Sequence, residues 1–205
     1  MRYKTPQDLR TESIAELVAT ILGEDIATLK IEKIAIEEFL LEGKTKIVCE
    51  VQHSEKTLQI QGEGRGVVDA LFGGMTRALA KDYRSLEGIE FIDFLVSIDP
   101  QRRGKKSGTD SYVNVDIQLQ NSSKSRMHFS SRSRSMISAA INASLLALEY
   151  FINCERAVLK TYDAIQRCEK HNMPETKEKY VDRLTRLVEN TSYEKTIAEY
   201  KGDIN

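Results

Sequence analysis

The sequence predicts an α+β domain made of two similar units, each with three antiparallel strands followed by one helix. The spacing of apolar residues changes from alternation to steps of three and four, and it does so twice along the chain. Turn-forming residues separate the alternating runs. The composition, 40% hydrophobic and 30% charged residues, is typical of a folded globular protein.

Residues 1–27 predict an N-terminal helical segment that precedes the two units. Apolar residues between Ile14 and Leu22 recur at helical spacing. Thr11 suits the N-cap of this helix, and Gly23 suits its end.

The first unit, residues 28–84, begins with a long strand from Leu29 to Leu40, for which we expect a bulge near Lys33. A turn at 42–44 leads to a second strand around 47–51. A turn at 53–56 leads to a third strand that ends at Gly62. After Gly66, apolar residues at three- and four-residue steps predict an amphipathic helix.

The second unit, residues 88–154, repeats this order. Residues 89–98 form an almost continuously apolar strand, followed by a polar loop at 101–110. Residues 113–119 alternate between apolar and polar, 121–125 turn, and a sixth strand contains Met127 and Phe129. A long helix follows, with apolar residues from Ile137 to Ile152.

The two units align at an offset of 69 residues. At this offset Leu58 falls on Met127 and Leu79 on Leu148. The strand-to-helix turn of the first unit has the pattern G-x-G-x-G, and that of the second has S-x-S-x-S; the six positions are Gly62, Gly64, Gly66, Ser131, Ser133 and Ser135. Internal repetition of this kind predicts a pseudo-symmetric domain.

The remainder, residues 155–205, predicts a polar helical tail. One apolar stripe runs from Val158 to Ile165, Met173-Pro174 interrupts it, and a second stripe contains Tyr180, Leu184 and Leu187. A short helix is expected near Ile197. Amphipathic helices of this length need a packing partner, either the core or a second chain.

The glycine-rich turn is the most informative candidate site. Glycine permits close approach of backbone or ligand, and the first turn of a helix attracts carboxylates and phosphates through its unpaired N–H groups. A Rossmann fingerprint is excluded because Val67 occupies the position of its third glycine. On spacing alone, glycines that serve only a tight turn are the simpler interpretation.

Two motifs give the chain a resemblance to a known family. The first is Gly64-Arg65-Gly66-Val67-Val68-Asp69-Ala70, and the second runs from Ser133 to Ala140 and is followed by Glu149-Tyr150. Together they are similar to the segments that open the two helices of the regulatory domain of the α-isopropylmalate synthase family; citramalate synthases share the second segment. The resemblance covers roughly residues 29–154.

This resemblance implies a function as well as a fold. The family's domain has two βββα units related by a pseudo-twofold axis, pairs with a second copy, and binds leucine or isoleucine at the junction as a feedback inhibitor. The ligand-binding positions implied here are Gly62, Gly64, Gly66, Asp69, Ala70, Ser131, Ser133, Ser135 and Ala139.

Several positions depart from the family pattern. Ser131 replaces a glycine, Ser135 replaces an acidic residue, and Val67 replaces a proline, while Arg65 and Arg134 replace smaller polar residues. These changes make the entrance to the implied site more basic and richer in hydroxyl groups. They favour a different anion, or no ligand, over strict retention of leucine or isoleucine.

We expect no catalysis by this chain alone. The family's catalytic half is a TIM barrel of roughly 250 residues, which does not precede the domain here; the start at Met1 is taken as intact, against the alternative that the chain is a fragment. His53, His128 and His171 lack ligand spacing, so neither metal nor cofactor is expected.

Other features predict partners and location. With a net charge of −1, neither nucleic acid nor membrane is an expected partner, and the basic loop at 102–106 is interpreted as solvated. Three cysteines without repeated spacing and the lack of a signal or a membrane-spanning run predict a cytoplasmic protein. Residues 130–135 are interpreted as helix-capping serines in preference to phosphorylation sites.

The sequence therefore predicts a stand-alone, homodimeric regulatory module of branched-chain amino acid biosynthesis that binds leucine, isoleucine or a related carboxylate. Three alternatives remain: a structural assembly module without a ligand, a subunit that acts in trans on a separate catalytic subunit, and an enzyme with unfamiliar chemistry on this scaffold.

Overall fold

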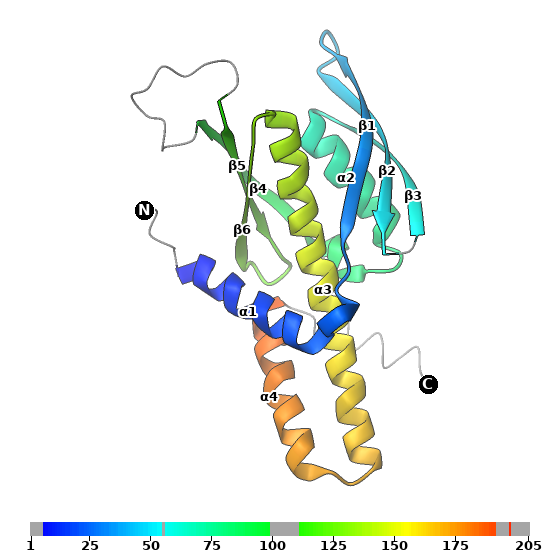
Figure 1. The fold of residues 1–205 in the computed structure, drawn as a ribbon, viewed down its shortest axis with the longest axis vertical. Coiled ribbons are helices and arrows are strands. Elements are labelled where there is room, and N and C mark those ends of the chain that lie inside the picture. Colours follow the sequence, from blue (N-terminus) through cyan, green and yellow to red (C-terminus); the bar gives the residue numbers. More distant parts are fainter. Residues whose placement is uncertain (1–5, 55, 99–110, 192–196, 198–205) are drawn as a thin grey trace.

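The computed structural model describes residues 6–54, 56–98, 111–191 and 197, and has three layers (Figure 1). Strands β1 (Leu29–Phe39), β2 (Lys44–His53) and β3 (Lys56–Gly64) form one antiparallel sheet. Strands β4 (Glu90–Ile98), β5 (Val113–Gln120) and β6 (Arg126–Ser133) form the other. Helices α2 (Val67–Leu79) and α3 (Met136–Lys170) lie between the sheets. The α+β class with two βββα units is confirmed.

The predicted repeat is present in the pairing of the strands. Cys49 of β2 pairs with Ile60 of β3, and Ile117 of β5 pairs with Phe129 of β6 at the equivalent place. All four side chains are buried, and they belong to a single core that both sheets and both helices share. The two repeats of the chain therefore bury their apolar faces against each other.

Each first strand contains an irregularity. The register of β1 with β2 shifts between Ile31 and Lys33, which confirms the bulge expected near Lys33. The register of β4 with β5 shifts between Phe91 and Asp93, a second bulge at the matching position. Bulges increase the local twist of a strand, so both sheets bend in the same way.

Small residues set the spacing between the helices and the sheets. A Cβ atom at Gly74 of α2 would lie 3.0 Å from the carbonyl oxygen of Gln61, so this helix rests directly on the backbone of β3. On α3, Ala139, Ala143 and Ala147 are fully buried and recur every four residues. This stripe lies on one side of the helix and permits close packing.

The N-terminal segment is a helix, as expected, but it begins earlier. Helix α1 spans Pro6–Leu22, so Thr11 lies inside it and does not cap it. Pro6 is well suited to the first turn because that position needs no N–H donor. Gly23 ends the helix with φ of +60° and opens the short 3-10 helix η1 (Gly23–Asp25).

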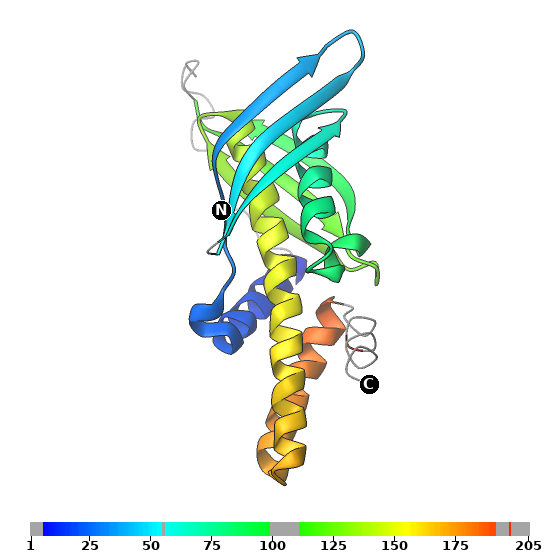
Figure 2. The ribbon, with the colours of Figure 1, turned by 90° about the vertical axis from the view of Figure 1, so that its right-hand side faces the viewer.

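The C-terminal part extends away from the sheets as a helical hairpin (Figure 2). Helix α3 runs without a break through residue 154, where the sequence suggested a domain boundary, and α4 (Pro174–Thr191) returns along it. The interruption at Met173-Pro174 is confirmed. Cys154, Val158 and Leu187 join apolar residues of α1 in a second, smaller core. Ile197 packs against this core, and the loop at 101–110 lies outside the described residues.

Helix α3 is long and apolar enough, by length and composition, to cross a membrane. In its most apolar window, however, 67% of the residues are buried inside the fold. The central position of α3 between two sheets accounts for this apolar composition (Figure 1).

Candidate functional site

The two strand-to-helix turns have matching geometry. The N–H of Ala70 donates to the carbonyl oxygen of Gly66 at 2.9 Å, and the N–H of Ala139 donates to that of Ser135 at 2.9 Å. Helices α2 and α3 thus begin at equivalent positions, one residue after Gly66 and after Ser135. The 69-residue offset therefore relates Gly66 to Ser135 and Ala70 to Ala139 in the structure as well as in the sequence.

In the first turn, two glycines are required by close packing. A Cβ atom at Gly62 would lie 1.9 Å from the carbonyl oxygen of Ala70, and one at Gly64 would lie 2.6 Å from the nitrogen of Ala70. Neither glycine has a positive φ. Ala70 itself is fully buried. The space beside Gly62 and Gly64 is therefore filled by the chain's own helix, which supports a structural role for these two residues.

The third glycine of the motif and the aspartate behave differently. Gly66 has open space around its α carbon. The Asp69 carboxylate accepts a hydrogen bond from the N–H of Arg65 at 2.8 Å and so closes the first turn of α2. A carboxylate in this turn is also favourably placed in the field of the helix dipole.

In the second turn, hydroxyl groups replace the glycines. Ser135 Oγ accepts from the N–H of Ser138 at 3.2 Å, which is an N-cap, and Ser133 Oγ accepts from the N–H of Ser135 at 3.3 Å. The preferred capping interpretation of these serines is confirmed for Ser135. Ser131 is half-buried at the end of β6, and Ala139 is fully buried beneath the turn.

The starts of both helices line one cavity of about 500 Å³. Of the nine predicted residues, Gly66 and Asp69 lie on its wall, and the other seven lie behind or beside the two turns. Val67, Val68, Met136 and Ile137 occupy the first turns of α2 and α3, where backbone N–H groups have no acceptor within their own helix. The cavity wall is formed by Arg65, Gly66, Val67, Val68, Asp69, Phe72, Phe91, Phe94, Met136, Ile137 and Ala140.

Most of the apolar wall was not anticipated from the sequence. Phe91 and Phe94 come from the edge strand β4, and both are 40% exposed. Phe72 of α2 approaches Phe91 edge to face, with ring centroids 6.0 Å apart. The continuous apolar run at residues 89–98 indicated a strand with two apolar faces, but it did not show which of its side chains would line a cavity.

The charges predicted at the entrance divide between two places. Arg65 lies on the cavity wall beside Asp69. The guanidinium groups of Arg132 and Arg134 lie over the ring of Tyr112, 4.4 and 5.3 Å from its centroid. These cation–π contacts hold two arginines next to the second turn. Of these arginines, Arg65 lines the cavity, whereas Arg132 and Arg134 are not part of its wall.

A smaller cavity of about 370 Å³ lies between α1, β6 and α3. Glu149 lines it and accepts a hydrogen bond from the N–H of Leu29 at 2.6 Å. Burial raises the pKa of this carboxyl group above its usual value, and the bond from Leu29 opposes the shift. Glu149 therefore mainly attaches the start of β1 to α3.

The histidines occupy structural positions. The ring of His53 is within hydrogen-bond distance, 2.9 Å, of the Tyr83 hydroxyl, and burial lowers its pKa. His128 lies 3.1 Å from the amide nitrogen of Gln118. Within the residues that the structure describes, no group of three or more His, Cys, Asp or Glu side chains is arranged to hold a metal ion.

Fold and site together define a duplicated βββα domain with one cavity at the paired starts of its two helices. The chain belongs to the family of the LeuA allosteric (dimerisation) domain, whose sequence model matches residues 8–152. The match covers well over half of the chain and includes most of α1. A search of curated proteins finds no match. The regulatory and dimerising character of the family is therefore shown, as the resemblance implied.

Proposed function

We propose that this chain is a stand-alone regulatory module that homodimerises and binds a small carboxylate, in the range of leucine and isoleucine, between its two helix starts. The observation that carries the proposal is the single cavity of about 500 Å³ that both helix starts line. Unpaired first-turn N–H groups and Arg65 suit a carboxylate, and the apolar wall suits a hydrocarbon side chain.

The role we propose is regulatory, without catalysis by this chain, and it is supported by the match to an allosteric (dimerisation) domain over residues 8–152. The module would then act on a separate synthase subunit in the cytoplasm, as part of branched-chain amino acid biosynthesis. Effector binding would be communicated through α2 and α3, because both begin at the cavity, α2 ends in the shared core and α3 continues into the helical hairpin.

Isothermal calorimetry with leucine, isoleucine and their keto acids tests the effector. We expect saturable binding of at least one of these carboxylates, weakened by Arg65→Gln. Lys81→Gln, which changes an exposed cation after α2, is the matched control. Absence of binding across the panel would favour a purely structural assembly module.

For the dimer interface, strand β4 is the best-supported surface. It is an edge strand, and four of its apolar side chains that do not line the cavity are 37–59% exposed: Ile92, Leu95, Val96 and Ile98. The other first strand, β1, carries charged residues such as Lys30, Glu32 and Glu37 on its exposed side, which protect an edge from pairing. Strand β4 carries fewer charges, Glu90 and Asp93, and a mainly apolar edge in a dimerisation domain fits a second copy of the chain.

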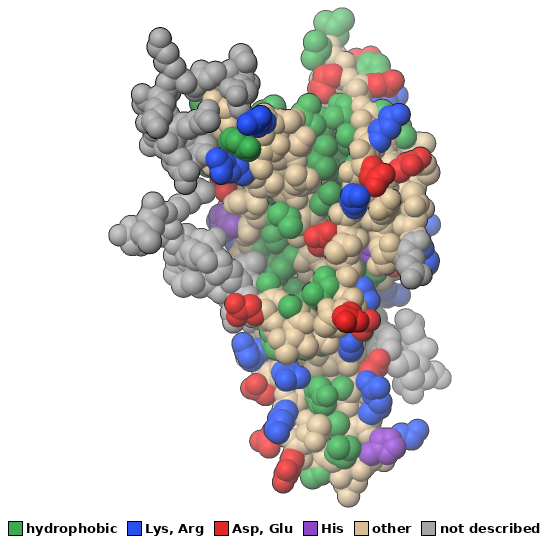
Figure 3. Space-filling view, viewed as in Figure 1, with side chains coloured by type: hydrophobic (Ala, Val, Ile, Leu, Met, Phe, Trp, Pro, Cys, Tyr) green, Lys and Arg blue, Asp and Glu red, His purple; other side chains and the backbone are tan. Residues whose placement is uncertain are grey.

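Sedimentation velocity tests this interface. We expect the full chain to be a dimer and Leu95→Lys to be a monomer at the same concentration. Leu41→Lys is the matched control, because Leu41 is fully exposed at the tip of the β1–β2 hairpin, where hydrophobic side chains are visible in Figure 3. A monomeric parent chain, or a Leu95→Lys variant that remains dimeric, would contradict the β4 interface.

A further inference from the structure

The ligand class follows from the size and lining of the cavity between the two helix starts. We propose that this cavity selects a carboxylate with an aromatic ring, an aromatic amino acid or its keto acid, over the branched aliphatic ligands. This inference rests on the proposed function, because it assigns ligand chemistry to the same cavity. It concerns specificity, and it can fail while the proposed function stands.

The first argument is volume. The cavity measures about 500 Å³ and is partly open to solvent; it has room for a ring, since an enclosed cavity of about 150 Å³ already holds benzene. The isobutyl side chain of leucine is smaller than benzene and would leave much of this space to water. Since apolar binding free energy grows with the apolar surface removed from water, a larger ring gains more in this cavity.

The second argument is the kind of wall. Three phenylalanines contribute to it: Phe72 from α2, and Phe91 and Phe94 from β4. Phe72 and Phe91 meet edge to face, with an angle of 81° between their planes. Aromatic rings prefer such offset and perpendicular neighbours, and each pair adds about two- to tenfold in affinity beyond the effect of its buried area. A ligand ring between these side chains gains contacts that an isobutyl group cannot make.

The third argument is charge. Arg65 and Asp69 are the charged residues on the wall, and the remaining lining is hydrophobic apart from Gly66. One cation for a carboxylate and an otherwise apolar cavity fit a ligand with one anionic group and a large apolar body. The aromatic amino acid and its keto acid share this chemistry, and comparing them shows whether Asp69 adds affinity for an ammonium group.

The chain contains no tryptophan, which makes a direct test available. Fluorescence anisotropy of L-tryptophan, titrated with the full chain, reports binding without a background from protein indole groups. Calorimetry then compares tryptophan, indole-3-pyruvate, phenylalanine and phenylpyruvate with leucine and its keto acid. We expect the aromatic ligands to bind at least about tenfold more tightly, since a single methylene changes affinity in a hydrophobic pocket by roughly 10–200-fold.

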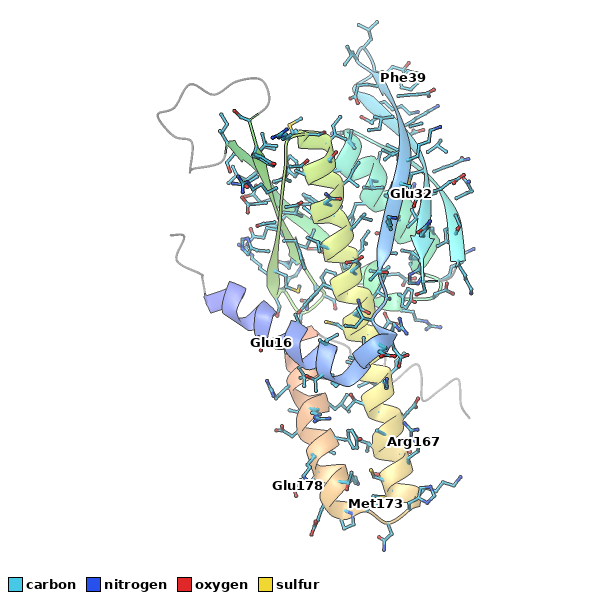
Figure 4. The ribbon with its side chains drawn as sticks, viewed as in Figure 1. Glu16, Glu32, Phe39, Arg167, Met173 and Glu178 are labelled. Atoms are coloured by element: carbon cyan, nitrogen blue, oxygen red, sulfur yellow. The ribbon has the colours of Figure 1, made fainter. Side chains whose placement is uncertain are left out.

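Phe94→Leu tests the wall itself. Because Phe94 is 40% exposed, its replacement should leave the fold intact, which circular dichroism checks. We expect about fivefold weaker binding of aromatic ligands and a clearly smaller loss for leucine, which lacks the ring-to-ring contact. Phe39→Leu is the matched control: Phe39 is 36% exposed and lies at the end of the β1–β2 hairpin, away from the cavity wall (Figure 4).

The outcomes separate the two proposals. Tighter binding of leucine than of every aromatic ligand overturns the aromatic specificity and supports the proposed function. Equal loss of leucine and tryptophan affinity in Phe94→Leu also overturns the specificity, because the ring would then serve only the shape of the site. Absence of binding for all six compounds overturns both.

Discussion

Asn153 of α3 forms a pair of hydrogen bonds with the backbone of Ala27. Its side-chain oxygen accepts from the Ala27 N–H at 2.8 Å, and its side-chain nitrogen donates to the Ala27 carbonyl oxygen at 2.8 Å. Both residues are buried. One side chain thus satisfies both backbone polar groups of Ala27 in the connection between α1 and β1, and it attaches that connection to the central helix.

Asn153→Ala is expected to destabilise the fold by about 2–3 kcal/mol, because it leaves a buried N–H and a buried carbonyl without partners. Urea unfolding measures the loss. Asn142→Ala on the same helix, where the side chain is exposed, should change the free energy of unfolding by less than about 0.5 kcal/mol. Equal effects of the two substitutions would show that the Ala27 contact contributes little.

The three glycines of the first turn should differ in their tolerance of a side chain. Gly62→Ala forces a Cβ atom against the Ala70 carbonyl and should cost about 3 kcal/mol or more. Gly66→Ala meets open space with an extended backbone and should have little effect. Thermal unfolding of both variants measures this difference in stability. A Gly62→Ala protein as stable as the parent chain would mean that α2 moves away from β3 with little loss of free energy.

Ser135 should contribute to stability as an N-cap. Ser135→Ala removes the acceptor for the Ser138 N–H and is expected to cost about 1 kcal/mol in the free energy of unfolding. Ser138→Ala retains that N–H and replaces an exposed helical serine with a better helix former, so it should be neutral or slightly stabilising. Denaturant unfolding of both variants, side by side, is the measurement. A cost at Ser138 equal to that at Ser135 would exclude the cap as the cause.

Glu149 should make stability depend on pH. Burial raises the pKa of its carboxyl group in the folded state above the ordinary value of 4.5, so the folded protein holds this proton more tightly than the unfolded chain does. Its contribution is therefore fully present below about pH 4.5 and is lost as the pH rises through the folded pKa.

Glu149→Gln removes this titration while an oxygen remains available to the Leu29 N–H. We expect the variant to gain stability relative to the parent chain as the pH rises from 4.5 to 7, measured by urea unfolding at several pH values. Glu16→Gln, at an exposed position on α1, is the control (Figure 4). A difference between parent and variant that does not change with pH would contradict this assignment.

Much of this architecture could be predicted because it follows from local patterns. Alternation of apolar residues identified the strands, steps of three and four identified α2 and α3, and the 69-residue register located Gly66 and Ser135 as equivalent helix starts. The bulge near Lys33 could be predicted because the alternation of apolar and polar residues changes phase between Ile31 and Ile34. Each of these features lies within a short stretch of chain, where periodicity and turn chemistry act directly.

Other features needed the three-dimensional arrangement. Pattern alone did not distinguish a helix that ends near residue 154 from one that continues to Lys170, because a change of packing partner along α3 leaves the helical period intact. Nor did it show that Gly62 and Gly64 face the backbone of α2, or that Phe91 and Phe94 line a cavity. A sequence records which residues are apolar, but only the packing of distant elements decides which of them are covered, and by what.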